Sequence, residues 1–210
     1  MSIKRIFIAG LFIFGATVSN ADNHSMGTDA AAVHPILVGA EAPSVNVRNI
    51  DGKSVDFRSL VTGKDSVVIF YRGGWCPYCN LQLGELAKQE VRLKALGYQI
   101  IAVSPDKPAE LKKSVEKNKV SYQLVSDSKA SLVKAFGLGF KVDAKTRELY
   151  KGYGIDLEVS SGESHYILPA PAVYLISKEG LVTFQYVNPN YKVRLSTKVL
   201  MAAAEEYRSK

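Results

Sequence analysis

The only two cysteines of the chain stand two residues apart in the stretch YRGGWCPYCNLQL, Tyr71–Leu83, and this stretch constrains the fold more than any other. The apolar run before it, Ser66–Tyr71, has the composition of a buried strand. Leucines at helical spacing follow it, up to a helix stop at Gly97. Pro77 suits the first turn of a helix, where its missing N–H is not needed. The pattern therefore predicts a CxxC pair at the amino terminus of a helix that directly follows a buried strand.

Cys76 and Cys79 are predicted to be redox-active. The unpaired N–H groups and the dipole at a helix amino terminus favour thiolate over thiol, and CxxC motifs lower a cysteine pKa from about 8.5 to about 3.5–7.5. Cys76 is expected to attack, and Cys79 to resolve the product. A structural disulfide is disfavoured, because so short a loop restricts the unfolded chain little. No metal site is expected, since structural zinc takes four ligands and His24, His34 and His165 stand alone in the sequence.

The amino terminus has the pattern of a secretory signal peptide. Two positive charges precede the uncharged apolar run Ile6–Val18, and small residues lead up to Ala21. We therefore predict a signal peptide over residues 1–21 that is cut after Ala21, and a periplasmic or secreted mature protein without stable membrane insertion. The apolar run is shorter than the roughly 20 residues that a membrane span needs.

The rest of the chain is predicted to form a flexible linker over residues 22–39 and one domain over residues 40–210. The domain opens with a β-hairpin around Asp51-Gly52, after which strands alternate with helices, as in parallel sheets with right-handed crossovers. Residues 138–168 have no clean period and are interpreted as an inserted loop with one helical turn or a short hairpin. The fold class is α/β, a thioredoxin-like fold with a central mixed sheet flanked by helices and an N-terminal β-hairpin extension.

Four stretches carry a resemblance to a known family: Val38–Pro43, Asp51–Lys53, Tyr71–Leu83 and Pro171–Ile176. Together they resemble the thioredoxin superfamily and, within it, the peroxiredoxin-like (AhpC/TSA, redoxin) branch. The tetrapeptide Cys-Pro-Tyr-Cys is the one that glutaredoxins use. The resemblance implies a thiol-based oxidoreductase without a bound cofactor, over the chain from about Val38 onward.

Two positions depart from the peroxiredoxin pattern. The resemblance places a threonine three residues before the attacking cysteine, where this chain has Gly73. It also places an arginine at the head of a late strand, where this chain has Pro171. Thioredoxins carry a cis-proline at that place, beside the active cysteines, with backbone groups free to pair with a substrate chain. We therefore predict a cis Ala170–Pro171 bond and a substrate-positioning role for Pro171.

Three neighbours of the cysteines are candidate site residues. Arg72 can supply positive charge to Cys76, because cations accompany reactive thiols, or it is a surface arginine at the end of the strand. Trp75 is interpreted both as part of an apolar patch that docks a thiol substrate and as packing that shields Cys79. The role of Tyr78 is left open between the same two readings.

Two functions compete for this site. The first is an exported thiol–disulfide oxidoreductase in which Cys76 attacks, Cys79 resolves and Pro171 orients a protein or small-molecule thiol or disulfide. The alternative is a peroxiredoxin-like thiol peroxidase for hydrogen peroxide or organic hydroperoxides, in which Cys76 becomes a sulfenic acid that condenses with Cys79. That condensation is expected to need a local rearrangement, because both residues would lie on one helical turn.

Both functions require an electron-donor redox protein as a partner, and sheet edges leave a homodimer open. A non-catalytic binding module or metallochaperone is the third alternative, and the lack of further ligands disfavours it. The formal net charge of +7 is spread along the chain. Since no basic cluster with interleaved aromatic residues is present, nucleic acid is not an expected partner.

Overall fold

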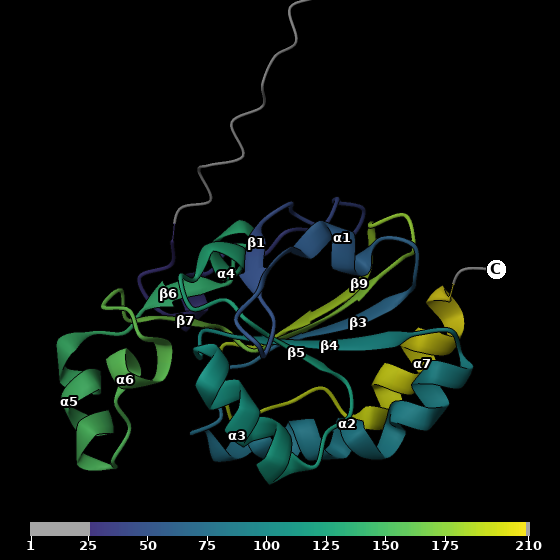
Figure 1. The fold of residues 1–210 in the computed structure, drawn as a ribbon. Coiled ribbons are helices and arrows are strands. Elements are labelled where there is room, and N and C mark those ends of the chain that lie inside the picture. Colours follow the sequence, from purple (N-terminus) through teal and green to yellow (C-terminus); the bar gives the residue numbers. More distant parts are fainter. Residues whose placement is uncertain (1–25, 209–210) are drawn as a thin grey trace, which may run out of the picture.

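The computed structural model describes residues 26–208, so the predicted signal peptide lies outside the described residues. Strands β3, β4, β5, β8 and β9 form the centre of the molecule, and helices cover them from both sides (Figure 1). The described strands are β1 (Asn46–Arg48), β2 (Ser54–Asp56), β3 (Ser66–Phe70), β4 (Gln99–Ser104), β5 (Gln123–Ser126), β6 (Gly139–Lys141), β7 (Ile167–Pro169), β8 (Ala172–Ile176) and β9 (Val182–Val187). The described α-helices are α1 (Phe57–Val61), α2 (Pro77–Ala95), α3 (Pro108–Asn118), α4 (Ser131–Ala135), α5 (Ala144–Gly152), α6 (Leu157–Ser161) and α7 (Thr197–Tyr207).

The main sheet has seven strands in the order β2-β1-β5-β4-β3-β8-β9. Strands β3, β4 and β5 pair in parallel, whereas β8 pairs antiparallel with β3 and β9 antiparallel with β8. The order confirms the predicted mixed sheet, with parallel strands at its centre and antiparallel strands toward its edges. The predicted N-terminal hairpin is confirmed as well, with Val47 of β1 opposite Val55 of β2. Its second arm ends at Asp56, whose carboxylate caps α1 by accepting from the Ser59 N–H.

Alternate residues of β3 divide the core into two layers. Val67, Ile69 and Tyr71 belong to the apolar cluster that α2, α3 and α7 cover. The side chains of Val68 and Phe70 belong to the cluster under α1 and α4 on the opposite face. Since side chains alternate between the two faces of a strand, a sheet covered on both faces needs a strand that is apolar at every position. This explains the continuous apolar run that precedes the cysteines.

The segment 138–168 is larger than the single turn or short hairpin predicted for it. Strands β6 and β7 pair with each other apart from the main sheet and form a stem, and α5 and α6 lie between them in the chain. In Figure 1, α5 and α6 stand beside the layered sheet rather than against either of its faces. No residue of α5 is buried, which explains why the sequence shows no apolar period there. We call residues 138–168 the insertion.

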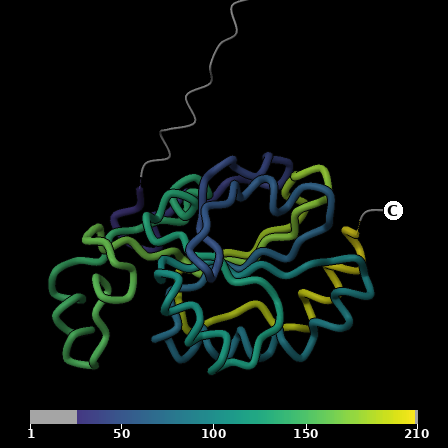
Figure 2. Tube along the Cα trace, viewed as in Figure 1, coloured from purple at the N-terminus to yellow at the C-terminus, as the bar shows by residue number. Residues whose placement is uncertain are grey.

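The prediction of a flexible linker over residues 22–39 was wrong for residues 26–39. The Gly27 N–H donates to the Gly139 carbonyl at 3.0 Å and the Ile36 N–H donates to the Phe136 carbonyl at 3.1 Å. A short 3-10 helix, Ala30–Ala32, is capped by the carboxylate of Asp29. The purple start of the described chain lies along the base of the green insertion in Figure 2. These backbone contacts make the segment part of the domain.

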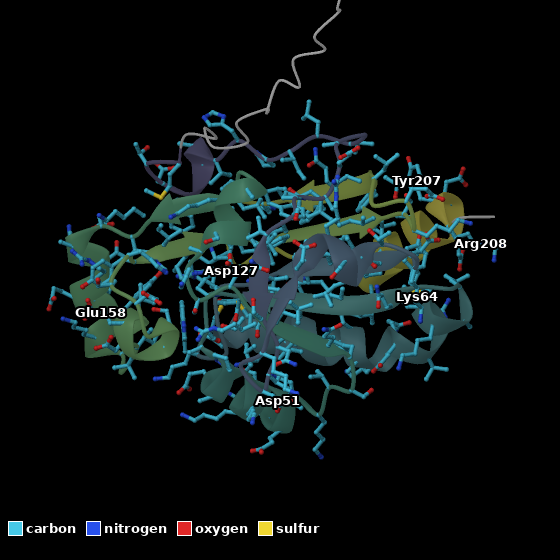
Figure 3. All side chains as sticks on the ribbon, turned by 45° about the horizontal axis from the view of Figure 1, so that its top comes forward. Asp51, Lys64, Asp127, Glu158, Tyr207 and Arg208 are labelled. Carbon is cyan, nitrogen blue, oxygen red and sulfur yellow. The ribbon has the colours of Figure 1, made fainter. Side chains whose placement is uncertain are left out.

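Charged residues lie both at the surface of the molecule and in its interior. Glu158 on α6 and Arg208 after α7 lie at opposite ends of the molecule, and Asp127 after β5 lies near its middle (Figure 3). Asp127 is buried and accepts hydrogen bonds from the backbone N–H groups of Leu132 and Val133. Within residues 26–208, none of the helices is both long and apolar enough to cross a membrane.

Candidate active site

The CxxC pair lies where β3 turns into α2, as predicted. Cys76 is the residue before the helix and has extended backbone angles, and Pro77 is the first helical residue. The Cys76 carbonyl accepts from the backbone N–H groups of Cys79 and Asn80, both at 3.1 Å. Both cysteines are free thiols, and their exposed fractions are 1% for Cys76 and 0% for Cys79. The pair is therefore a reduced dithiol that is almost closed off from solvent.

The two thiols have opposite tendencies to ionise. A hydrogen bond from the Cys79 thiol is the main cause that lowers the pKa of Cys76 to about 6, and the Cys79 backbone N–H, Arg72 and Arg194 add to it against the effect of burial. Burial and the bond to Cys76 raise the pKa of Cys79 well above its usual range. Near neutral pH, Cys76 is therefore a thiolate, which is the nucleophilic form, and Cys79 keeps its proton.

The two sulfurs are in contact in the reduced protein. Cys76 is the residue directly before α2, and its sulfur accepts a hydrogen bond from the Cys79 thiol. The local rearrangement expected for the condensation of a Cys76 sulfenic acid with Cys79 stays a prediction.

Arg72 is a buried cation beside the cysteines and not a surface residue. It is 4% exposed, and its positive charge lowers the pKa of Cys76. Its guanidinium lies 5.1 Å from the ring centre of Trp75, 5.4 Å from that of Tyr150 and 4.1 Å from that of Tyr191. A cation within about 6 Å of an aromatic ring is attracted by the ring face. Three rings from three segments of the chain thus hold Arg72 next to Cys76.

Arg194 is a second cation at the site, and no pattern in the sequence pointed to it. Its Nη2 lies 3.5 Å from the Cys79 sulfur, as a donor. Arg194 belongs to the segment 188–196, which joins β9 to α7 and also carries Tyr191. The ring of Tyr191 packs edge-on against Tyr78, with ring centres 5.8 Å apart. This segment therefore covers the cysteines from the side of α7.

Trp75 packs against the insertion. Its ring centre lies 5.8 Å from that of Tyr150 on α5, and the residue is only half-buried. The predicted shielding of Cys79 by Trp75 and the predicted docking of a substrate on Trp75 both stay predictions. Tyr78 is 37% exposed at the start of α2.

A groove of about 310 Å³ borders the site between α2 and α7. Tyr78 and Leu81 line it on the side of α2, and Leu195 and Leu200 line it on the other side. Arg194 lines the same groove and contacts the Cys79 sulfur. The groove is thus connected to the dithiol through one arginine side chain.

Gly73 and Asp106 shape the turn before Cys76. Asp106 follows β4, is 2% exposed and accepts a hydrogen bond from the Gly74 N–H at 2.7 Å. Burial raises the pKa of this carboxyl to about 7, and the Gly74 N–H opposes the rise. Gly73 has φ of +150°, and a Cβ there would lie 2.3 Å from Trp75 Nε1 and 2.8 Å from Asp106 Oδ1. No side chain fits at Gly73 in this backbone.

The prediction of a cis bond before Pro171 was wrong. The Ala170–Pro171 peptide bond is trans, which is the more stable isomer for most X–Pro bonds. The Pro171 carbonyl accepts from the Asn188 N–H at 3.1 Å, and therefore continues the pairing of β8 with β9. Since Ala172 pairs with Phe70, Pro171 lies at the same end of the sheet as the turn to Cys76. Its substrate-positioning role stays a prediction.

Metal ligands do not gather anywhere in the described part of the chain. No group of three or more His, Cys, Asp and Glu side chains is close enough there to hold an ion. The His165 side chain instead forms a hydrogen bond with the backbone, and its Nε2 lies 2.7 Å from the Ser128 carbonyl oxygen.

Comparison with known proteins identifies the family. The model of the AhpC/TSA family matches residues 38–185. The chain belongs to the AhpC/TSA family. Peroxiredoxin Bcp of Escherichia coli is 28% identical over 106 residues, which are 50% of this chain and 67% of that protein. The chloroplastic peroxiredoxin Q of Oryza sativa subsp. japonica is 27% identical over 150 residues, which are 71% of this chain and 58% of that protein.

Solved structures of this family share the fold. Reduced Prx3 of Vibrio vulnificus in complex with hydrogen peroxide superimposes with a TM-score of 0.67 at 21% identity, covering 81% of this chain and 99% of that one. A peroxiredoxin-like protein of Aquifex aeolicus superimposes with a TM-score of 0.64 at 21% identity, covering 83% and 90%. This chain is an antioxidant oxidoreductase of the peroxiredoxin type with a thioredoxin fold.

Proposed function

We propose that this protein is a thiol peroxidase that reduces hydrogen peroxide or organic hydroperoxides, with Cys76 as the attacking thiolate and Cys79 as the resolving thiol. The observation that carries the proposal is the thiol–thiol contact, which leaves Cys76 ionised and Cys79 protonated near neutral pH. Membership in the AhpC/TSA family and relatives named peroxiredoxin support this function above the disulfide-exchange function.

The reaction proceeds in three steps. The Cys76 thiolate attacks the terminal peroxide oxygen, the S–O bond forms, the O–O bond breaks, and the leaving alkoxide or hydroxide takes up a proton. The Cys79 thiol then attacks the sulfenic sulfur, which forms the disulfide and releases water. A dithiol redox protein returns two electrons and two protons by exchange through a mixed disulfide, and so restores both thiols. Neither a metal nor an organic cofactor takes part in these steps.

A thiol–disulfide oxidoreductase is the second candidate function. Gly73 and Pro171 favour it, because they stand where the peroxiredoxin pattern has threonine and arginine. The same dithiol would then exchange with disulfides of other proteins or of small molecules. The two functions differ in which oxidant reacts rapidly with Cys76.

Rapid mixing of the reduced protein with hydrogen peroxide tests the choice. Trp75 is the only tryptophan and adjoins Cys76, so its fluorescence reports oxidation of the site. We expect a rate far above that of a free thiol, lost in Cys76→Ser. In Cys79→Ser the reaction should stop at a sulfenic acid that a dimedone-type reagent captures. Slow oxidation by peroxide together with rapid exchange with glutathione disulfide would instead establish the second function.

Export to the periplasm or out of the cell is part of the same proposal. It rests on the charged start, the apolar run Ile6–Val18 and the small residues before Ala21. The mature protein is expected to begin at Asp22, which mass spectrometry of the protein from a cell fraction measures directly. Recovery of a chain that keeps residues 1–21 from the cytosol would contradict export.

A further inference from the structure

The proposed peroxidase reaction needs a donor that binds the peroxide and gives a proton to the leaving oxygen. The backbone at Gly73 excludes a hydroxyl side chain at the position where the family pattern has threonine, because Trp75 and Asp106 occupy that space. The carboxyl of Asp106 accepts from the Gly74 N–H in the turn before Cys76, and Arg72 does not give up a proton at any ordinary pH. A hydroxyl group from another segment of the chain can fill this role.

Tyr150 brings a hydroxyl group to this place from the insertion. Its ring packs on Trp75 at 5.8 Å between ring centres, and Arg72 Nη2 donates a hydrogen bond to its hydroxyl oxygen. Burial raises the pKa of the Tyr150 hydroxyl, Arg72 opposes the rise, and the charges of Tyr191 and Cys76 add to it. Because Trp75 directly precedes Cys76, the contact between the two rings places Tyr150 beside the dithiol.

The direction of the bond to Arg72 decides what the hydroxyl can do. A phenol is both donor and acceptor. Since its oxygen accepts from Arg72, its own proton is available to an acceptor that enters the site. The positive charge of Arg72 would also stabilise a phenolate after proton transfer. Among residues 26–208, Tyr150 is the tyrosine whose hydroxyl is hydrogen-bonded to Arg72.

We propose that Tyr150 is a catalytic residue of the peroxidase reaction, which binds the peroxide through its hydroxyl and protonates the leaving oxygen. This inference rests on the proposed function. As the thiolate attacks, the O–O bond breaks and the alkoxide takes the Tyr150 proton. The phenolate remains paired with Arg72 and recovers its proton from water. The transfer is downhill, because hydroxide and alkoxides are stronger bases than a phenolate.

This assignment gives the insertion a role at the site. The donor and its partner form a Tyr150–Arg72 pair, in which one member comes from α5 and the other from the end of β3. The pair replaces the threonine and arginine that the family pattern has at positions 73 and 171 of this chain. Removal of the hydroxyl should therefore affect reduction of a peroxide more than the nucleophilicity of Cys76.

Tyr150→Phe tests the proposal, with Tyr153→Phe as the matched control. The first variant keeps the ring that packs on Trp75 and Arg72, and the second alters a side chain of the insertion that is 72% exposed. For each variant, the rate with hydrogen peroxide is compared with the rate of alkylation of Cys76 by iodoacetamide. Alkylation needs the thiolate but breaks no O–O bond, so it reports the pKa and access of Cys76 alone.

We expect Tyr150→Phe to lower the peroxide rate about 100-fold, as for loss of one preorganised donor or general acid, and to change alkylation by less than about threefold. Tyr153→Phe should change neither rate. An unchanged peroxide rate in Tyr150→Phe would overturn the inference, and so would an equal fall in both rates. If the wild-type protein reacts with peroxide no faster than a free thiol, the proposed function itself fails, which is a separate result.

Discussion

Replacement of Cys79 with alanine measures how much the thiol–thiol hydrogen bond contributes to the reactivity of Cys76. This bond is the largest cause that lowers the Cys76 pKa to about 6. A hydrogen bond to a charged group is worth about 1.5–3 kcal/mol, and one pKa unit corresponds to about 1.36 kcal/mol. We therefore expect the pKa of Cys76 to rise to about 7–8 in Cys79→Ala. The Cys79 backbone N–H, Arg72 and Arg194 remain in place and keep it below the value of a free thiol.

The assay is the rate of alkylation of Cys76 by iodoacetamide as a function of pH. Since only the thiolate reacts, the rate rises as pH increases through the pKa and then reaches a plateau. Cys79→Ser is the matched control, because a hydroxyl can still donate to the Cys76 sulfur and should hold the pKa nearer the wild-type value. A midpoint of Cys79→Ala that coincides with that of the wild type would refute the reasoning and would leave the cations as the main cause.

Three further predictions concern the neighbours of the dithiol. Arg194→Met should raise the pKa of Cys76 by less than Cys79→Ala does, because the charge of Arg194 lowers that pKa less than the hydrogen bond from the Cys79 thiol does; a larger rise in the same alkylation assay would contradict this. Gly73→Thr should lower the free energy of unfolding by about 1–3 kcal/mol, because its backbone lies in a region that side chains rarely adopt; a urea midpoint equal to that of the wild type would show that the turn can relax. The carboxyl of Asp106 has a pKa of about 7 in the folded protein, above its ordinary value of 3.8, so the folded state binds the proton more tightly and its stability falls as pH rises from about 4 to about 7. Asp106→Asn should remove up to about 4 kcal/mol of that fall, and urea unfolding at about pH 5 and about pH 8 that shows the same difference in both proteins would count against it.

The strand and the helix at the centre of the fold could be predicted from the sequence. The apolar run before Cys76, the proline after it and the spacing of leucines define β3 and α2 within one or two residues, because burial on both faces leaves a plain pattern. Arg72 was identifiable as well, because it is only four residues from Cys76. The burial of Arg72 among aromatic rings could not be predicted, because two of the three rings belong to distant segments of the chain.

The rest of the site is assembled by tertiary structure. Arg194 is 115 residues from Cys79 and Tyr150 is 78 residues from Arg72, and neither lies in a pattern that indicates a site. Asp106 had a weaker signal, because it directly follows β4, the strand parallel to β3, and parallel strands end at the same edge of a sheet. The linker prediction failed because alanine-rich, polar residues give no periodicity, although Asp29 before three alanines has the form of a helix cap.

The pairing of β6 with β7 determines which changes in the insertion the fold can accept. Gly139 pairs with Pro169 and Lys141 with Ile167, so the two ends of the insertion meet outside the main sheet. Residues 142–166 can therefore differ in length between relatives while the strands of the main sheet keep their pairing. Because Tyr150 also contacts Arg72, whose charge lowers the pKa of Cys76, such exchanges would change both the proposed donor and the reactivity of the thiolate. Chimeras that exchange this segment between family members would then also exchange the preference for one peroxide over another.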